Sequence, residues 1–432
     1  MSFEKKVKLW AWLQNPQEMV DADDIAACGA RSCRSEFCSA EIHKSEVRRE
    51  DYLKRKETIF RESSGRGHGA VEDQSAFVFS IDNLTRASTL VLCGPQYASH
   101  DQQSLRVATA ERGFHLPDGL DGEARKIMEA QFGLYEIMQS AGVPGEDARF
   151  ILPLYTKTAI QSLWSARELK HLDFMARRGG VLSEVKDTVE QMVEQARSAA
   201  PKLMENRGAN YEVLSWMPSS QLFARNNLTL SELIGDVGDG SGPVLLSSSK
   251  IPMGEEQIRR AVEERDEAEL ANLKHFHFTY LAHLSLASFH QATRQRSWDQ
   301  SVEPLRAAVE HSRIYVVPRS VEEKGFGSEF RKLSSRAVGY VAQRLDEPEA
   351  YGVLPHSLSV YDLIHINGWN AIHAIGKRTC KMAQWEIRDI SQRMAEGIRR
   401  VLPELGKYAV PQGKIYGKCP ERVPCGECFK KD

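Results

Sequence analysis

An internal repeat constrains this chain more than any other feature of its sequence. The chain aligns with itself, without a gap, at an offset of 202 residues. The matched pairs are Leu152 with Leu354, Pro153 with Pro355, His171 with His373, Glu184 with Glu386, Asp187 with Asp389, Met192 with Met394, Glu194 with Glu396, Arg197 with Arg399, Pro201 with Pro403 and Leu203 with Leu405. An ordered set of this kind indicates duplication of a whole folding unit. The chain must therefore fold as two related units.

The repeat predicts two domains joined by a short linker. The stretch GDVGDGSGPVLLSSSK, residues 235–250, is rich in Gly and Ser, as flexible linkers are. We therefore place the first repeat at residues 1–234, the linker at 235–250 and the second repeat at 251–432. A chain of 432 residues is long enough for two such domains.

Each repeat contains strand-like runs followed by a segment of helical periodicity. SAFVFSI at 75–81 and KHFHFTYL at 274–281 have the apolar composition of strands. In the second repeat, apolar residues recur at helical spacing. They are Ile387, Ile390, Met394, Ile398 and Val401. Strands followed by helices predict the α+β class, with a β-sheet packed with helices in each domain.

The two repeats differ at polar positions in a complementary way. The differing pairs, first repeat first, are Ser165 and Asn367, Ala176 and Arg378, and Arg149 and Tyr351. GPQYASHDQQSLR at 94–106 keeps a Gln-Gln-Ser-x-Arg end, whereas RQRSWDQSVEPLR at 294–306 keeps paired arginines. The planar fork of arginine suits phosphate and the polar edge of a base. Spacing alone leaves open that these are ordinary surface arginines.

These segments resemble those of the flavin-dependent thymidylate synthases. CKMAQWEIR at 380–388, which follows Arg378, is similar to the family's closing AQWEIR segment. GHGAVEDQSAFVF at 67–79 is similar to its GHxSxxEHxxFTF stretch, with Asp73 and Gln74 where the family has Glu and His. The opening KVKLWAWLQNPQEMVDA and the tail GKCPERVPCG also resemble the family. The resemblance covers nearly the whole chain and implies two tandem, diverged domains of this fold.

The resemblance also implies roles for individual residues. It implies cofactor binding by His68, Arg294, Arg296, Asn367 and His373. It implies substrate binding by Gln102, Gln103, Ser104, Arg106, Arg149 and Arg378. Gln295 replaces the central histidine of the family's RHR motif. Family sites form between subunits of a tetramer, so we expect a composite site and a homodimer that acts as a pseudo-tetramer. In that site the first repeat would supply phosphate contacts, and the second flavin and base contacts.

The activity implied is flavin-dependent C5 methylation of a uracil nucleotide, dUMP or a close analogue. FAD would be the cofactor, and methylenetetrahydrofolate and NADPH the co-substrates. No protein nucleophile is expected, because Cys93 ends an apolar run and fits buried structure. Two alternatives stay open. The first is altered one-carbon chemistry on a pyrimidine nucleotide, because Gln74, Asp101 and Gln295 depart from the family pattern. The second is a non-catalytic nucleotide-binding relative.

Charge and hydropathy exclude several other partners. The net charge of −2 creates no general field that attracts nucleic acid or an anionic membrane. The N-terminal MSFEKKVKLWAW lacks the apolar run of a signal peptide. No stretch approaches the roughly 18 apolar residues of a membrane span. We therefore expect a cytoplasmic protein that binds neither nucleic acid nor membrane.

The eight cysteines raise the question of a metal site. Three lie in CGARSCRSEFC and three in KCPERVPCGEC, where the spacing of Cys419, Cys425 and Cys428 resembles a partial zinc ligand set. A closed zinc site needs four ligands, and neither cluster supplies four. The similarity of the tail to the family's tail also favours reduced thiols without a metal. We therefore predict no metal site.

Overall fold

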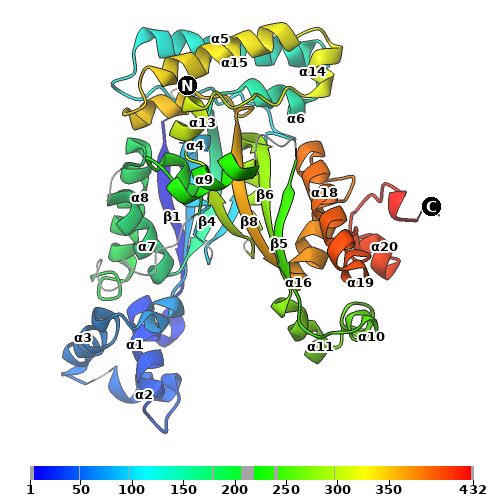
Figure 1. Ribbon diagram of the computed structural model, residues 1–432. Helices are drawn as coiled ribbons and strands as arrows, with labels where there is room; N and C mark the ends of the chain where they lie inside the picture. The colour runs from blue at the N-terminus through cyan, green and yellow to red at the C-terminus, as the bar shows by residue number, and fades with distance from the viewer. Residues whose placement is uncertain are drawn as a thin grey trace. The chain divides into compact units, whose positions relative to one another are not determined.

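The chain separates into two compact units, which we describe one at a time (Figure 1). A computed structural model describes residues 4–47, 49–95, 97–177, 180–205, 218–237, 242–295 and 297–429. The first unit comprises Met1–Met128, Pro153–Ser220 and Asp346–Gly352. The second comprises Glu129–Leu152, Gln221–Leu345 and Val353–Asp432.

Each unit contains a four-stranded antiparallel sheet, and the strand order is the same in both. The first sheet has the order β1-β2-β4-β3 and the second the order β5-β6-β8-β7. The strands are β1 Lys6–Trp12, β2 Phe77–Thr85, β3 Ser99–Gln102, β4 Lys157–Trp164, β5 Val244–Ser249, β6 His277–Ser285, β7 Asp299–Val302 and β8 Ser359–Asn367. Two like sheets packed with helices confirm the predicted α+β class, and β2 and β6 contain most of the two predicted strand runs.

Helices of the first unit pack on its sheet and form an N-terminal cluster. They are α1 Ala22–Ser32, α2 Ser39–Glu46, α3 Tyr52–Glu62, α4 Arg86–Leu92, α7 Ala166–Arg177 and α8 Ser183–Ala199, with short helices η1 Pro16–Glu18, η2 Ser64–Arg66 and η3 Gly69–Gln74. The Gln195 amide of α8 accepts from the Leu9 N–H at 2.6 Å and donates to the Val7 carbonyl at 3.0 Å. These bonds satisfy part of the free edge of β1, which would otherwise offer unpaired backbone groups.

Among the described residues, the second unit has more helices than the first, and most of them are short. They are α6 Gly145–Ala148, η4 Arg149–Ile151, α9 Leu228–Val237, α10 Glu255–Arg259, η6 Arg260–Glu264, α11 Glu267–Asn272, η7 Leu273–His275, α12 Leu286–Ala292, α13 Leu305–Glu310, α14 Arg319–Glu323, α15 Gly327–Ala342, α16 Gly368–Asn370, η9 Ala371–Ile375, α17 Gly376–Arg378, α18 Trp385–Val401, α19 Pro403–Gly406, α20 Gln412–Tyr416 and η10 Glu427–Phe429. Helix α5 Gly122–Ser140, and the short helices η5 Pro218–Phe223 and η8 Pro348–Val353, each contain residues of both units.

Helix α18 carries the predicted apolar stripe and packs against the second sheet. Ile387, Ile390, Met394 and Ile398 are buried, as the periodicity predicted. The prediction was wrong for Val401, which is 42% exposed because it is the last residue of the helix. The Tyr280 hydroxyl of β6 donates to the Met394 carbonyl at 2.7 Å.

Part of the predicted linker is a strand. Val244–Ser249 form β5, the edge strand that pairs antiparallel with β6. Leu246 packs against a buried cluster that includes Leu230 and Ile234 of α9, so its apolar side chain favours the sheet over a solvated linker. Residues 238–241 of the predicted linker lie outside the described residues. The repeat boundaries at 234 and 251 stay predictions.

The second unit includes a segment from the first sequence repeat. Within residues 129–152, the Asp147 carboxylate accepts from the Trp385 indole N–H at 2.8 Å. The Phe150 ring stacks on Trp385 with centroids 5.9 Å apart. The Ser357 N–H donates to the Phe150 carbonyl at 2.8 Å. Arg149, which the sequence assigns to the first repeat, therefore lies in the second unit.

The first unit, conversely, includes a segment from the second repeat. The Tyr155 hydroxyl donates to Glu349 at 2.6 Å, and the Tyr155 N–H donates to the Gly352 carbonyl at 2.9 Å. Glu349 also accepts from the Ser183 N–H at the start of α8, at 2.7 Å. A Cβ atom built on Gly352 would lie 2.1 Å from the Tyr155 ring, so only glycine fits this close approach.

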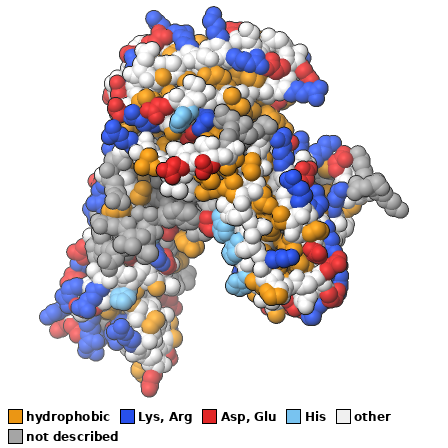
Figure 2. Space-filling view, viewed as in Figure 1, with side chains coloured by type: hydrophobic (Ala, Val, Ile, Leu, Met, Phe, Trp, Pro, Cys, Tyr) orange, Lys and Arg blue, Asp and Glu red, His pale blue; other side chains and the backbone are white. Residues whose placement is uncertain are grey.

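The face of the molecule drawn in Figure 2 carries charges of both signs. Figure 2 shows basic and acidic side chains interspersed over the face drawn, in keeping with the net charge of −2. Among the described residues, no helix has the length and apolar character needed to cross a membrane.

Candidate functional site

The candidate site in the second unit joins two segments that the sequence singled out separately. One, which we call the signature loop, comprises Arg294, Gln295, Ser297 and Trp298, between α12 and β7. The other is the 367–378 segment, which comprises the end of β8, α16, η9 and α17. Two sets of side-chain contacts fasten these segments together.

The first set of contacts holds Arg378. With the Gln295 amide oriented so that its oxygen faces the guanidinium, that oxygen accepts from Arg378 Nη2 at 2.9 Å and from Nε at 3.0 Å. Arg378 Nη2 also lies 3.3 Å from the Gln291 carbonyl oxygen. Two bonds to one edge of a planar guanidinium fix the direction of the whole group. Gln295 stands where the RHR motif has its central histidine. It is thus a partner of Arg378, a contact that the sequence did not predict.

The second set of contacts holds the start of the 367–378 segment. The Asn370 amide donates to the Ser297 carbonyl at 3.0 Å and accepts from the Ser297 hydroxyl at 2.5 Å. Asn367 caps α16, because its side-chain oxygen accepts from the Asn370 N–H at 2.9 Å. The predicted flavin contact Asn367 therefore also has a structural role.

Close backbone approaches explain why this segment can take its path. A Cβ atom on Gly368 would lie 2.6 Å from the Leu273 carbonyl oxygen, and one on Gly376 would lie 2.5 Å from that of Val410. Neither position accepts a larger residue without movement of backbone. Between them, Ala371–Ile375 form a π-helix, a feature that is frequent at functional sites.

His373 projects from this π-helix and is half-buried. Its ring stacks on Trp369, with centroids 5.5 Å apart and an interplanar angle of 12°. Burial, and then the nearby Lys377 charge, lower the pKa of His373 below its ordinary value. The imidazole is therefore neutral at neutral pH and can both donate and accept a hydrogen bond. Arg294 is half-buried, and Arg296 lies outside the described residues.

Arg149 lies in the same unit as these groups and is buried. Its Nε donates to the Glu146 carbonyl at 3.1 Å. Its charge acts on Glu386 of the AQWEIR motif, whose carboxylate accepts from the Ser285 N–H at 2.7 Å and from the Ser285 hydroxyl at 2.5 Å. Burial raises the pKa of Glu386 to about 7, although Ser285 and Arg149 act in the opposite direction. The glutamate thus fastens α18 to the end of β6.

The remaining predicted substrate residues lie in the first unit. The Ser104 hydroxyl accepts from the Arg106 N–H at 3.2 Å, and both residues are exposed. The Gln102 amide donates to the Thr89 hydroxyl at 2.8 Å. The Gln103 side-chain oxygen accepts from Arg112 Nε at 3.1 Å. Both glutamine side chains thus contribute to the fold of the unit.

His68 is also in the first unit, where it is exposed and precedes η3. The structure therefore gathers Arg149, Arg294, Asn367, His373 and Arg378 in one unit, and His68, Gln102, Gln103, Ser104 and Arg106 in the other. Their roles in binding stay predictions.

Ion pairs occupy the corresponding region of the first unit. The Lys170 ammonium and the Glu72 carboxylate form a fully buried pair 2.5 Å apart. Arg167 Nη1 lies 2.9 Å from Asp73. The second repeat has the apolar Ile372 and Trp369 at the offset positions of the two cations. These pairs were not predicted from the sequence, although the adjacent acids of the VEDQ stretch were a possible signal.

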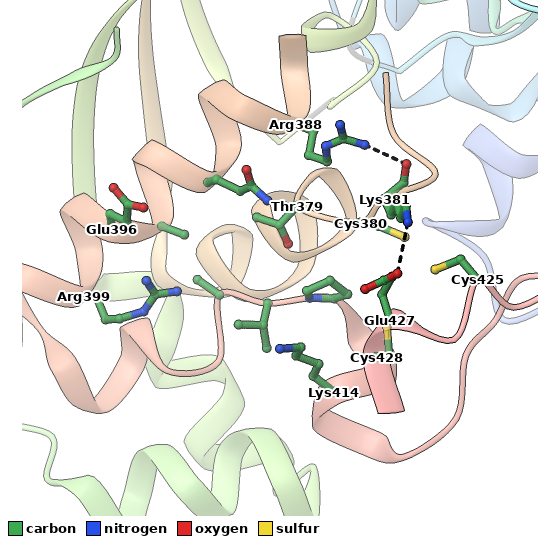
Figure 3. A pocket seen from close by; sticks show the side chains of 15 residues that line it. Thr379, Cys380, Lys381, Arg388, Glu396, Arg399, Lys414, Cys425, Glu427 and Cys428 are labelled. Carbon is green, nitrogen blue, oxygen red and sulfur yellow. Dashed lines mark hydrogen bonds and ion pairs between the residues drawn. The ribbon is translucent and has the colours of Figure 1, made fainter. Parts of the chain in front are cut away.

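The described cysteines form no disulfide, and Cys93 is half-buried. Among the described residues, no group of three or more His, Cys, Asp or Glu side chains is placed so that it could hold a metal ion. Cys380 lines the same pocket as Cys425 and Cys428 of the tail (Figure 3).

Comparisons with known proteins place these features in a family. The thymidylate synthase complementing protein family matches residues 17–202 and 252–404, well over half of the chain and parts of both repeats. The chain is 31% identical over 152 residues to a flavin-dependent thymidylate synthase of Geobacter sulfurreducens, which covers 33% of this chain and 65% of that protein. It is also 31% identical over 142 residues to a flavin-dependent thymidylate synthase of Pyrococcus furiosus. That match covers 30% of this chain and 58% of that protein. The chain thus spans less than two thirds of the length of either relative.

A solved structure also shows similarity at low identity. It is that of a UMP/dUMP methylase from Streptomyces cacaoi, determined with 5-Br dUMP. The identity is 18% and the TM-score 0.38, over 47% of this chain and 93% of that one.

Proposed function

The chain belongs to the thymidylate synthase complementing protein family, and on that premise we propose that it methylates a uracil nucleotide at C5 in a flavin-dependent reaction. The nucleotide would be dUMP or a close analogue. Methylenetetrahydrofolate would supply the one-carbon unit and NADPH the reducing equivalents. The similarity to named flavin-dependent thymidylate synthases supports this assignment.

The observation that carries the proposal is the joining of the signature loop to the 367–378 segment. Gln295 binds Arg378 at one end and Ser297 binds Asn370 at the other. An arginine with one edge held by protein has a guanidinium group of fixed direction. Such a group suits recognition of the polar edge of a uracil base better than a freely rotating side chain does.

The residues of the second unit fit a flavin with a charged phosphate region. Arg294 and Arg296 would hold the phosphates, while Asn367 and His373 would contact the ring system. FAD would supply the hydride chemistry when bound. The neutral His373, supported by Trp369, can share a proton with a ring nitrogen or carbonyl without adding a charge.

The protein's own contribution is then binding, orientation and exclusion of water. Arg378 would orient the base, and Arg149 would attract the nucleotide phosphate from within the same unit. Ser104 and Arg106 would complete the phosphate contacts from a first unit. Because the composite site needs both kinds of unit, we propose a homodimer in which two chains form a pseudo-tetramer.

Nucleotide titration into four variants tests the assignment of the substrate residues. Loss of one charge-assisted contact costs about 1.5–3 kcal/mol, or roughly a ten- to hundredfold loss of affinity. Arg149→Ala and Arg378→Ala should therefore weaken dUMP and UMP binding by this factor. The matched positions of the other repeat, Tyr351→Ala and Ala176→Ser, should leave affinity unchanged. Equal nucleotide affinities for all four variants and the wild type would contradict the assignment of Arg149 and Arg378 to substrate binding.

The flavin assignment has its own test. The purified protein should be yellow, and mass spectrometry of the extracted cofactor should identify FAD. Arg294→Ala combined with Arg296→Ala should remove the flavin absorbance while circular dichroism stays unchanged. A wild-type protein that shows no flavin spectrum after incubation with excess FAD would favour the non-catalytic alternative.

Light scattering tests the assembly. We expect the mass of a dimer at micromolar concentration. A stable monomer that binds both flavin and nucleotide would contradict the composite pseudo-tetramer.

A further inference from the structure

Three acid–base side chains form a chain of hydrogen bonds on the second sheet. His365 Nδ1 lies 3.1 Å from Asp299 Oδ2, and His365 Nε2 lies 3.1 Å from His277 Nδ1. The two imidazole rings stack with centroids 5.0 Å apart and an interplanar angle of 15°. Figure 2 shows histidine side chains, in pale blue, gathered at the surface of the face drawn. The three side chains are not placed to hold a metal ion, but they give a proton one continuous path from β6 to β7.

The strand register places this chain on the same face of the sheet as Asn367. In the antiparallel pair of β6 and β8, His277 lies opposite Asn367. In the pair of β7 and β8, Asp299 lies opposite His365. Residues that lie opposite one another, or two apart on one strand, share a face of the sheet. Since Asn367 is a proposed flavin contact, the His277 end of the chain lies beside the proposed cofactor region.

The hydrogen bonds determine which nitrogen of each histidine carries the proton. A carboxylate can only accept, so His365 donates to Asp299 from Nδ1 and accepts at Nε2. His277 therefore donates from its Nδ1, and its Nε2 keeps a lone pair. No described residue forms a hydrogen bond with this Nε2 atom. His277 thus offers a basic nitrogen at the end of the chain.

The surroundings keep His277 neutral near pH 7. Burial lowers the pKa of His277 most, and the neighbouring His365 and His275 lower it further. Asp299 acts in the opposite direction. These three neighbours lie on β8, on η7 and on β7 respectively. A neutral imidazole can take up a proton, whereas an imidazolium cannot.

The first unit has a different pair at the matched position of its sheet. There Ser99 of β3 lies opposite Leu163 of β4. The second unit has Asp299 opposite His365 at this position. Leu163 is exposed and carries no proton to transfer, so the sheet forms at this position without a hydrogen-bonded histidine. The chain therefore occurs in the unit that also holds Arg378.

We propose that His277, His365 and Asp299 form a proton relay for the methylation, an inference that rests on the proposed function. When carbon replaces hydrogen at C5 of the uracil, the C5–H bond breaks and its electron pair stays in the ring. His277 Nε2 accepts the proton and forms an N–H bond. The Nδ1 proton of His277 passes to His365 Nε2, and the Nδ1 proton of His365 passes to Asp299, which is exposed and releases it to solvent. His277 is the base, and the other two are positioning residues that act through it.

Steady-state kinetics of the full-length, flavin-loaded protein test the base. General base catalysis contributes about 10²–10⁴-fold to a rate, so His277→Gln should lower kcat at least about a hundredfold. KM for dUMP should not change, because the imidazole moves a proton and does not anchor the nucleotide. His311→Gln, which changes an exposed histidine of the same unit, is the matched control and should keep the wild-type kcat. Flavin absorbance equal to that of the wild type shows that a variant is folded.

These kinetics separate the relay from the proposed function. Wild-type protein that binds flavin but forms no methylated nucleotide would overturn both. Wild-type turnover with an unchanged kcat in His277→Gln would overturn the relay alone.

Asp299→Asn tests the positioning role through the dependence on pH. Asp299 raises the pKa of His277, so its loss should lower that pKa further. The acidic limb of the pH profile of kcat should therefore move to lower pH, which a merely structural role would not cause. Nitrogen-15 NMR of histidine-labelled full-length protein, without nucleotide, measures the same titration independently of turnover, and His277→Gln identifies the His277 signals. An unchanged acidic limb or an unchanged His277 titration in Asp299→Asn would overturn the relay.

Discussion

The buried Glu386 predicts a specific dependence of stability on pH. Burial raises the pKa of this carboxyl to about 7 from an ordinary value of 4.5. Between these values the folded state holds a proton that the unfolded state has lost. Stability contributed by this group therefore falls as the pH rises from about 4.5 to about 7 and is constant above that range. A shift of this size corresponds to about 3 kcal/mol.

Glu386→Gln removes the titration while it keeps the shape of the side chain. Near pH 5 the wild-type carboxyl is neutral, so the two proteins should differ by less than about 1 kcal/mol. Near pH 8 the glutamine variant should be the more stable by about 3 kcal/mol. Ser285 can still donate to the amide oxygen. Asp362, whose pKa burial also raises to about 7, is present in both proteins, so its contribution cancels.

Urea unfolding monitored by tryptophan fluorescence, at several values of pH, measures this difference. Glu396→Gln, an exposed position on the same helix, is the matched control and should change stability by less than about 0.5 kcal/mol at every pH. A stability difference between Glu386→Gln and wild type that does not grow with pH would refute the reasoning. If the wild type instead became the more stable protein as the pH rises, Arg149 would be holding the Glu386 carboxylate ionised.

Three other substitutions test contacts described above. Trp385→Phe removes the donor to Asp147 and should destabilise the second unit by about 1–3 kcal/mol in thermal unfolding, since it leaves the carboxylate of a buried residue with one bond fewer. Gly352→Ala should cost about 1–3 kcal/mol, because its Cβ would overlap the Tyr155 ring; an unchanged melting temperature would contradict this packing. Gln295→Leu should weaken uracil nucleotide binding about tenfold at unchanged melting temperature, and wild-type affinity would show that the amide does not orient the arginine.

The sequence predicted those features that depend on local pattern. The apolar stripe of α18 and the runs in β2 and β6 could be predicted because burial of one face requires them. The position of Arg149 could not, since it depends on how Phe150 and Asp147 pack against Trp385, more than 200 residues away. The pattern of apolar residues does not indicate which of two related units a segment packs against.

The site residues divide in the same way. The motifs singled out Arg378 and Asn367, whose roles in binding stay predictions, but the bond from Arg378 to Gln295 depends on a tertiary contact. The sequence also could not predict that Cys380 lines the same pocket as Cys425 and Cys428, because these residues are far apart along the chain.

The exchange of segments between the repeats limits what recombination can do with this gene. A break between the repeats would leave the first half without Glu349 and Gly352, which its own Tyr155 binds. The second half would lack the Asp147 and Phe150 partners of Trp385. The sequence repeats and the compact units therefore have different boundaries. A copy that was lost or transferred alone would therefore take with it contacts that the other unit uses.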